Sequence, residues 1–175
     1  ESSRQFIELG LWTSSTYQKN NQDSELSTFA KLLIKADREA LVLAAPENLQ
    51  IAYLDLLGNT LNAEDFDNQL EKYVASKNQK AAIAQAAAIK LFRIHPDRAE
   101  LLPFILNSLG SSNLDLFVRG ADLLIETHQT LSSKDETLLL KRMLQSDEKA
   151  FSEKAFQTLD TMGISEATLP RLTEL

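Results

Sequence analysis

Two histidines, His95 and His128, are the side chains of this sequence best suited to metal binding or acid–base chemistry, and they lie 33 residues apart. Each follows a stretch whose apolar spacing predicts a helix. Each is therefore expected at a helix C-terminus, where a positive charge is mildly favoured. A metal site needs three or four ligands, and no third ligand accompanies this pair. The chain also has no cysteine, which removes thiolate ligands, disulfides and a cysteine nucleophile. We predict no metal site.

Carboxylates and serines are plentiful, but their positions are those of helix starts. Acidic side chains gather at Glu64–Asp65–Asp67, Asp135–Glu136 and Asp147–Glu148. Capping and the helix dipole account for acids at such places without acid–base catalysis. No serine stands in a Gly-x-Ser-x-Gly elbow, and no glycine-rich phosphate loop is present. We therefore predict no catalytic residues, no cofactor and no enzymatic activity.

Charge and hydropathy restrict the class of partner. The net charge is −7 with a sequence pI near 4.9, and the lysines and arginines are scattered along the chain. Such a chain repels a phosphate backbone, so nucleic-acid binding is disfavoured. No apolar run approaches the roughly 18 residues of a membrane span.

The absence of cysteine suits both cytoplasm and periplasm. Because the chain begins at Glu1 without an initiator Met, we expect a fragment or a processed chain.

The elements that must position these side chains are helices. Gly and Pro are rare, with 5 and 4 residues, and the apolar spacing is helical with no convincing alternation. One domain is expected over residues 1–175, with an N-terminal helix and loop at 1–23 and helical hairpins at 24–175. Asn62 is predicted to cap a helix with Asp65, and Ser132 or Ser133 to cap another with Glu136 as the capping-box partner of Ser133. The range 24–45 is expected to hold one long helix or two, with a break or kink near Asp37 favoured. Further helices are expected near 46–59, 62–75, 78–94, 97–109, 114–127, 133–145, 149–162 and 165–175.

A small residue recurs in the first helix of each predicted hairpin. Ala52, Ala86, Ala121 and Ala155 are spaced by 34, 35 and 34 residues, and a Leu-Pro step recurs at Pro103 and Pro170. A period of this length is typical of stacked arrays, because a single hairpin cannot bury its apolar face alone. The alternative is an irregular helical bundle in which alanine, a common residue here, recurs by chance.

Three segments resemble the HEAT-repeat family. LQIAYLDLLGN (49–59) is similar to the first helix of such a repeat, AELLPFILNSL (99–109) to the second, and FVRGADLLIE (117–126) keeps a Val-Arg pair. The resemblance covers residues 46–175 and implies an all-α, right-handed α-solenoid. Only Arg119 matches the arginine of the family, while Gln50 and Lys154 do not. The tetratricopeptide repeat has a similar period, but its Trp, Leu-Gly and Tyr pattern is missing.

Fold type favours a protein-interaction scaffold, in which the second helices present a groove to another protein or peptide. Two alternatives stay open. One is an accessory helical domain of a larger enzyme that positions a substrate or partner. The other, an enzyme on a helical-repeat fold similar to HEAT-like glycosylases, is disfavoured by the net charge. Neither the oligomeric state nor the compartment follows from the sequence. The residues expected to face a partner are Asn68, Gln69, Lys72, Arg98, Asn107, Lys141 and Arg142.

Overall fold

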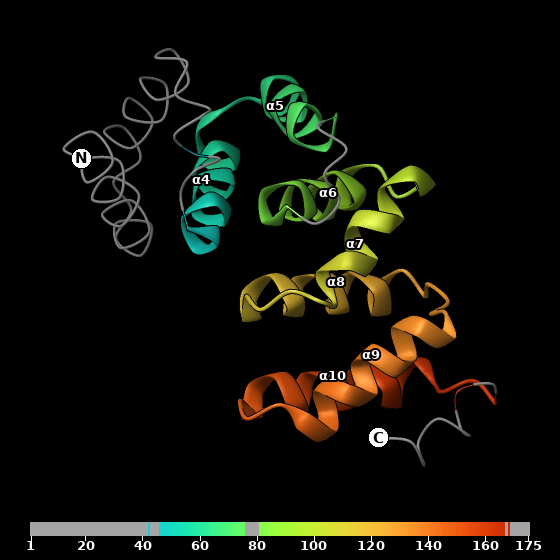
Figure 1. Ribbon diagram of the computed structural model, residues 1–175. Coiled ribbons are helices and arrows are strands. Elements are labelled where there is room, and N and C mark those ends of the chain that lie inside the picture. Colours follow the sequence, from blue (N-terminus) through green and yellow to red (C-terminus); the bar gives the residue numbers. More distant parts are fainter. Residues whose placement is uncertain (1–41, 43–45, 76–80, 167, 169–175) are drawn as a thin grey trace. The chain divides into compact units, whose positions relative to one another are not determined.

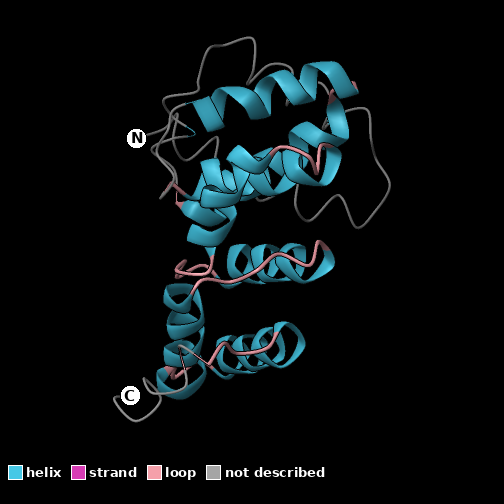
Figure 2. Ribbon diagram, turned by 90° about the vertical axis from the view of Figure 1, so that its right-hand side faces the viewer, coloured by secondary structure: helices cyan, strands magenta, loops and turns pink. Residues whose placement is uncertain are grey.

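Helices make up the regular structure. The computed structural model describes residues 42, 46–75, 81–166 and 168, and those residues include no strand (Figure 2). The all-α class is therefore confirmed for them, whereas the segments predicted at 2–12, 13–23 and 24–45 and most of 165–175 lie outside the described residues. In chain order the elements are α4 (Glu47–Thr60), α5 (Ala63–Ala75), α6 (Ala82–Ile94), the 3₁₀ helix η2 (Ala99–Leu101), α7 (Leu102–Ser108), α8 (Leu114–Glu126), α9 (Ser133–Gln145) and α10 (Lys149–Met162) (Figure 1).

The chain forms two compact units, residues 1–87 and 88–175, which divide within α6. In the first unit α4 packs against α5. A Cβ at Gly58 would lie 3.1 Å from Cζ of Phe66, so the Phe66 ring closes on the α4 backbone at a position without a side chain. The predicted cap of α5 is confirmed, because the amide N–H of Asp65 donates to Oδ1 of Asn62 at 2.9 Å and Nδ2 of Asn62 donates to the Asp65 carboxylate.

Helix α6 is buried along most of its length because its side chains are mostly small. Alanines dominate its sequence, and a small side chain lets neighbouring helices approach closely. The helix ends at Ile94, directly before His95-Pro96, as the proline predicted. Its predicted start at Asn78 lies outside the described residues. The residues of α6 with at most 5% exposure are Ala82, Ile83, Ala84, Gln85, Ala86, Ala87, Ala88, Ile89, Leu91 and Phe92.

In the second unit, α8 packs against both α7 and α10, and α10 packs against both α8 and α9 (Figure 1). The seam between α8 and α10 contains Ala121 and Ala155, which are both fully buried. These two alanines occupy the predicted small-residue position. In the first unit the equivalent Ala52 is only half-buried, so the predicted equivalence of the alanines does not extend to it.

Two predicted helix starts need correction. Helix α9 is capped by Ser132 with Asp135 as its partner, and the two side chains form the reciprocal capping box. Glu136 was wrong as the capping-box partner, because it lies one position further along and turns into the interior. The helix predicted near 97–109 begins later than expected. The chain instead enters α7 through η2, whose N-cap Arg98 makes no side-chain cap, and Pro103 stands in the first turn of α7.

Polar and aromatic contacts join segments of the second unit that are about one predicted repeat apart. The rings of Phe117 and Phe151, 34 residues apart, lie 5.3 Å from centroid to centroid. Lys154 donates to the carboxylate of Asp122, 32 residues earlier. Further links of similar separation are Arg93–Glu126, Arg142 to the Ser111 carbonyl, and Ser165 to Glu136. These links therefore connect segments of the second unit that are 29 to 34 residues apart in the sequence.

Candidate protein-binding surface

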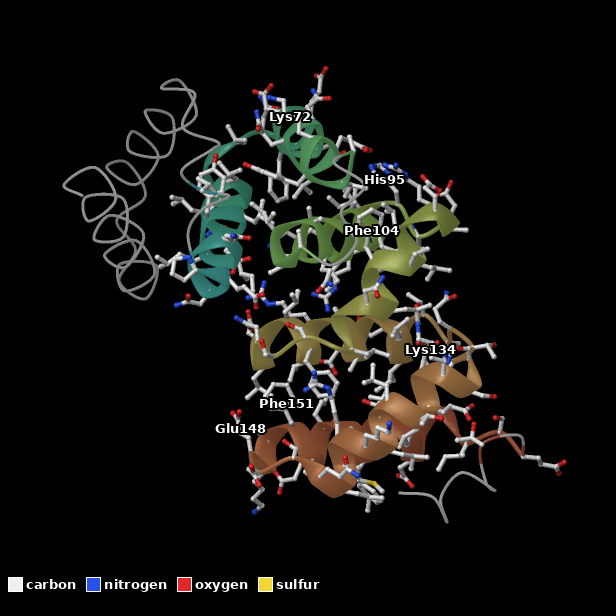
Figure 3. All side chains as sticks on the ribbon, viewed as in Figure 1. Lys72, His95, Phe104, Lys134, Glu148 and Phe151 are labelled. Atoms are coloured by element: carbon white, nitrogen blue, oxygen red, sulfur yellow. The ribbon has the colours of Figure 1, made fainter. Side chains whose placement is uncertain are left out.

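The three predicted contact residues of the first unit all lie on α5. Asn68 and Lys72 are exposed, and Gln69 is half-buried. Lys72 stands in the last turn of the helix, where a cation interacts favourably with the helix dipole (Figure 3). The same helix carries Glu64 and Asp65 in its first turn. The exposed side of α5 is therefore polar and of mixed charge.

Arg98 and Asn107 are bound within their own segment. Nε of Arg98 donates to Oε1 of Glu100 at 2.7 Å, and this ion pair lowers the pKa of the Glu100 carboxyl. Nδ2 of Asn107 donates to the carbonyl of Pro103, one turn earlier on α7, at 2.7 Å. Some of the hydrogen-bond donors of both side chains are therefore already engaged within their own segment.

Arg142 lies inside the second unit. Its guanidinium carbon is 4.9 Å from the ring centroid of Phe117 and 4.6 Å from that of Phe151, and Nη2 donates to the Ser111 carbonyl. Figure 3 shows Phe151 between α8 and α10. Burial lowers the pKa of Arg142, and its Nε is buried without a hydrogen-bond acceptor. The cation therefore joins α9 to the α7–α8 turn and to two aromatic rings that are tilted relative to each other.

Lys141 lies about 100° around the helix from Arg142 and faces different surroundings. It is exposed, as is Lys134 two turns earlier on the same helix (Figure 3). Half-buried Leu138 stands between them, and Leu144, 56% exposed, follows one turn later. We call Lys134, Leu138, Lys141 and Leu144 the α9 outer stripe. It combines cationic and apolar side chains on one side of a helix whose other side is core.

Glu136 faces the core from the inner side of α9 and is 4% exposed. Its carboxylate accepts from the backbone N–H of Ser165 at 3.2 Å and from the Ser165 hydroxyl at 2.7 Å. Burial raises the pKa of Glu136, but the hydrogen bonds from Ser165 and Thr168 outweigh burial and hold the pKa below its usual range. The carboxylate is thus a buried anion that clamps the chain after α10.

A hollow of about 410 Å³ lies beside this clamp. Two residues with left-handed backbone border it, Gly163 at φ +83° and His128 at φ +52°. His128 ends α8: its N–H donates to the carbonyl of Ile125 and the N–H of Gln129 to that of Leu124, the pair of bonds that glycine usually completes. Other residues lining the hollow are Leu131, Glu136, Met162 and Ser165.

Polar side chains beside the hollow are hydrogen-bonded to one another. The Ser165 hydroxyl is bonded to Glu136 and lies 3.2 Å from the Thr168 hydroxyl, so its contacts are those of a clamp. Across the described part of the chain, no group of three His, Asp or Glu side chains could hold a metal ion. The sequence predicted His128 at a helix C-terminus, and it directly follows the C-cap of α8, but its positive φ was not predicted. The sequence analysis also missed the bond of Glu136 to Ser165, because that contact joins residues 29 positions apart.

Comparison of the chain with protein-family models, curated proteins and solved structures finds no match. The class that the fold defines for the described residues is an all-helical protein. Among the described residues, no helix is long and apolar enough to cross a membrane.

Proposed function

We propose that this protein is a non-catalytic interaction module, an α-solenoid of HEAT-like hairpins whose second helices bind another protein or peptide. The α9 outer stripe carries the proposal. Helix α9 buries Leu139 and Leu140 on its inner side, while its outer side presents exposed lysines and an exposed leucine. A solvated helix face is ordinarily polar, so apolar side chains beside cations favour a surface that receives a partner.

The solenoid part of the proposal is supported by the links of near-repeat spacing. A contact between tilted rings 34 residues apart and an ion pair between residues 32 apart connect α8 to α10. In a stacked array each hairpin contacts its neighbours in the same register, so side chains one period apart are expected to meet. The full burial of Ala121 and Ala155 agrees with a close approach of consecutive first helices.

Site-specific photocrosslinking tests the proposed function. A benzophenone amino acid replaces Lys141 on the second-helix face, or Asp160, which is exposed on α10, as the matched control. Each variant is irradiated in an extract of the source organism. We expect a discrete crosslinked product of larger mass from position 141 and none from position 160.

Two results would count against the proposal. Products of the same mass and yield from both positions would indicate random encounters instead of a defined face. A product from position 160 alone would place the binding surface on the first helices. Circular dichroism of both variants checks that the substitution leaves the helices intact.

A further inference from the structure

Cations of the second unit are mostly neutralised by carboxylates close to them. Arg119 pairs with Asp115 on the same helix at 2.9 Å, and Lys149 pairs with Glu153 at 3.2 Å. Lys154 pairs with Asp122 across the α8–α10 seam. Two more ion pairs between described residues of this unit are Arg93–Glu126 and Arg98–Glu100.

Lys134 and Lys141 differ from these cations, because neither forms an ion pair with a described residue. Their own helix contains two acids, but both are engaged elsewhere. Asp135 accepts from the backbone and hydroxyl of Ser132 in the capping box, and Glu136 accepts from Ser165 on the inner side. The outer stripe therefore retains two uncompensated positive charges in a protein whose net charge is −7.

Geometry defines what would complement this stripe. Lys134 and Lys141 are seven residues apart on one helix, which separates their attachment points by roughly 10 Å along the axis. Leu138 stands between them and Leu144 one turn beyond, so apolar surface lies within and beside the pair of charges. A complementary ligand needs two anionic groups at the same spacing and an apolar side chain between them.

We infer that the α9 outer stripe binds an acidic peptide segment of a partner protein, one with two carboxylates about two helical turns apart and leucine-like side chains between them. The inference rests on the proposed function and names the chemistry of its partner. Charge complementarity supplies the attraction, while the leucines distinguish a peptide from a polyanion such as nucleic acid. The lysines of the stripe would then pair with carboxylates of the peptide, and the leucines of the stripe would contact its apolar side chains.

The test uses a fluorescein-labelled helical peptide with Glu at positions i and i+7 and Leu at i+3 and i+4. Fluorescence anisotropy measures its binding to the full chain at low ionic strength. We expect the Lys134→Glu/Lys141→Glu variant to weaken binding by about tenfold or more, since like charges then oppose each other. Lys149→Glu, a single exposed reversal on α10, is expected to stay within about twofold of the parent. Lys141→Glu alone, which makes the same change in net charge, should weaken binding measurably more than Lys149→Glu.

Several outcomes would overturn the inference. These are failure of the peptide to bind at about millimolar concentration, equal binding of a Lys-for-Glu peptide, and equal binding by the double variant. Tighter binding of a labelled DNA single strand, with the same dependence on Lys134 and Lys141, would reassign the stripe to polyanions. The crosslink from position 141 separates the two claims. If it persists while the acidic peptide fails, the interaction module stands and only the acidic partner is wrong.

Discussion

Arg142 and Lys141 are adjacent in the sequence and opposite in role. Arg142 lies over two aromatic rings and donates to a backbone carbonyl, whereas Lys141 is exposed and forms no ion pair with a described residue. A helix rotates about 100° per residue, so neighbours face different surroundings. The structure thus assigns one cation of the pair to stability and leaves the other available for binding.

Arg142→Ala tests the stabilising role. We expect the free energy of unfolding to fall by about 1–3 kcal/mol, because the variant loses a cation–π contact and a charge-assisted hydrogen bond. Lys141→Ala is the matched control and should change stability by no more than about 0.5 kcal/mol. Denaturant midpoints of the two variants measure the difference. Equal midpoints would show that Arg142 is not fastened as described.

Glu136 predicts a dependence of stability on pH. Its pKa is lower in the folded chain than in the unfolded chain, so its contribution is complete above the unfolded value of about 4.3. That contribution is lost as the pH falls through the lower, folded pKa. We therefore expect the parent to exceed Glu136→Gln in stability at neutral pH, with the gap narrowing below about pH 4.5. A gap that stays constant from neutral to acidic pH would contradict this assignment.

Gly120 is required by a close contact between α8 and α7. A Cβ at this position would lie 1.8 Å from Oγ of Ser108, whose hydroxyl is buried and donates to the Ile105 carbonyl. Gly120→Ala should therefore lower stability by about 1–3 kcal/mol despite the better helix propensity of alanine. Adding Ser108→Ala removes the clashing oxygen and should recover part of the loss. Thermal melts of the single and double variants measure both effects, and an unchanged Gly120→Ala melt would contradict the contact.

The contacts between neighbouring helices determine how closely the elements pack. Helices α8 and α10 pack against each other, and each contributes a fully buried alanine and one ring of a tilted phenylalanine pair. The sequence interval between the paired residues is one predicted repeat, so the same local pattern serves both sides of the seam. Small residues at the seam set how closely the helices approach, and larger ones at its end fill the space.

Ala121→Leu and Ala155→Leu should each cost about 1–3 kcal/mol, because a packed seam has no room for additional carbon atoms. Ala150→Leu is the control, since Ala150 is exposed on α10 and its change should stay within about 0.5 kcal/mol. Ala52→Leu should fall between these values, as Ala52 is half-buried. Urea denaturation of the four variants would reveal the order. A harmless Ala121→Leu would leave the irregular bundle as the better description.

Across the whole molecule, some charged side chains form contacts within the fold, whereas others are exposed without an ion pair to a described residue. The chain carries −7 overall, yet the outer stripe of α9 is cationic because the acids of that helix serve as cap and clamp. On α8 and α10, by contrast, four acids pair with cations near them: Asp115, Asp122, Glu126 and Glu153. The sign of the charge on one part of the surface therefore depends on which charged side chains are engaged in contacts within the fold.

Far-UV circular dichroism of the full chain should be dominated by the helical signature, with no sheet component. The physical reason is the helical apolar spacing and the scarcity of Gly and Pro. Thermal melting recorded at the helical minimum should then report unfolding directly. A clear sheet contribution would contradict the class of fold itself.

The sequence by itself determined the all-α class and most helix bounds in the described residues. Local signals are enough for this: the predicted range 149–162 coincides with α10, and Asn62 caps α5 as expected. Only tertiary structure decided the rest, since Glu136 and Arg142 act through Ser165 and Ser111, about 30 residues away. Apolar periodicity shows which side of a helix is buried but not which distant side chain a polar group meets. The different surroundings of Lys141 and Arg142 are therefore a consequence of tertiary packing.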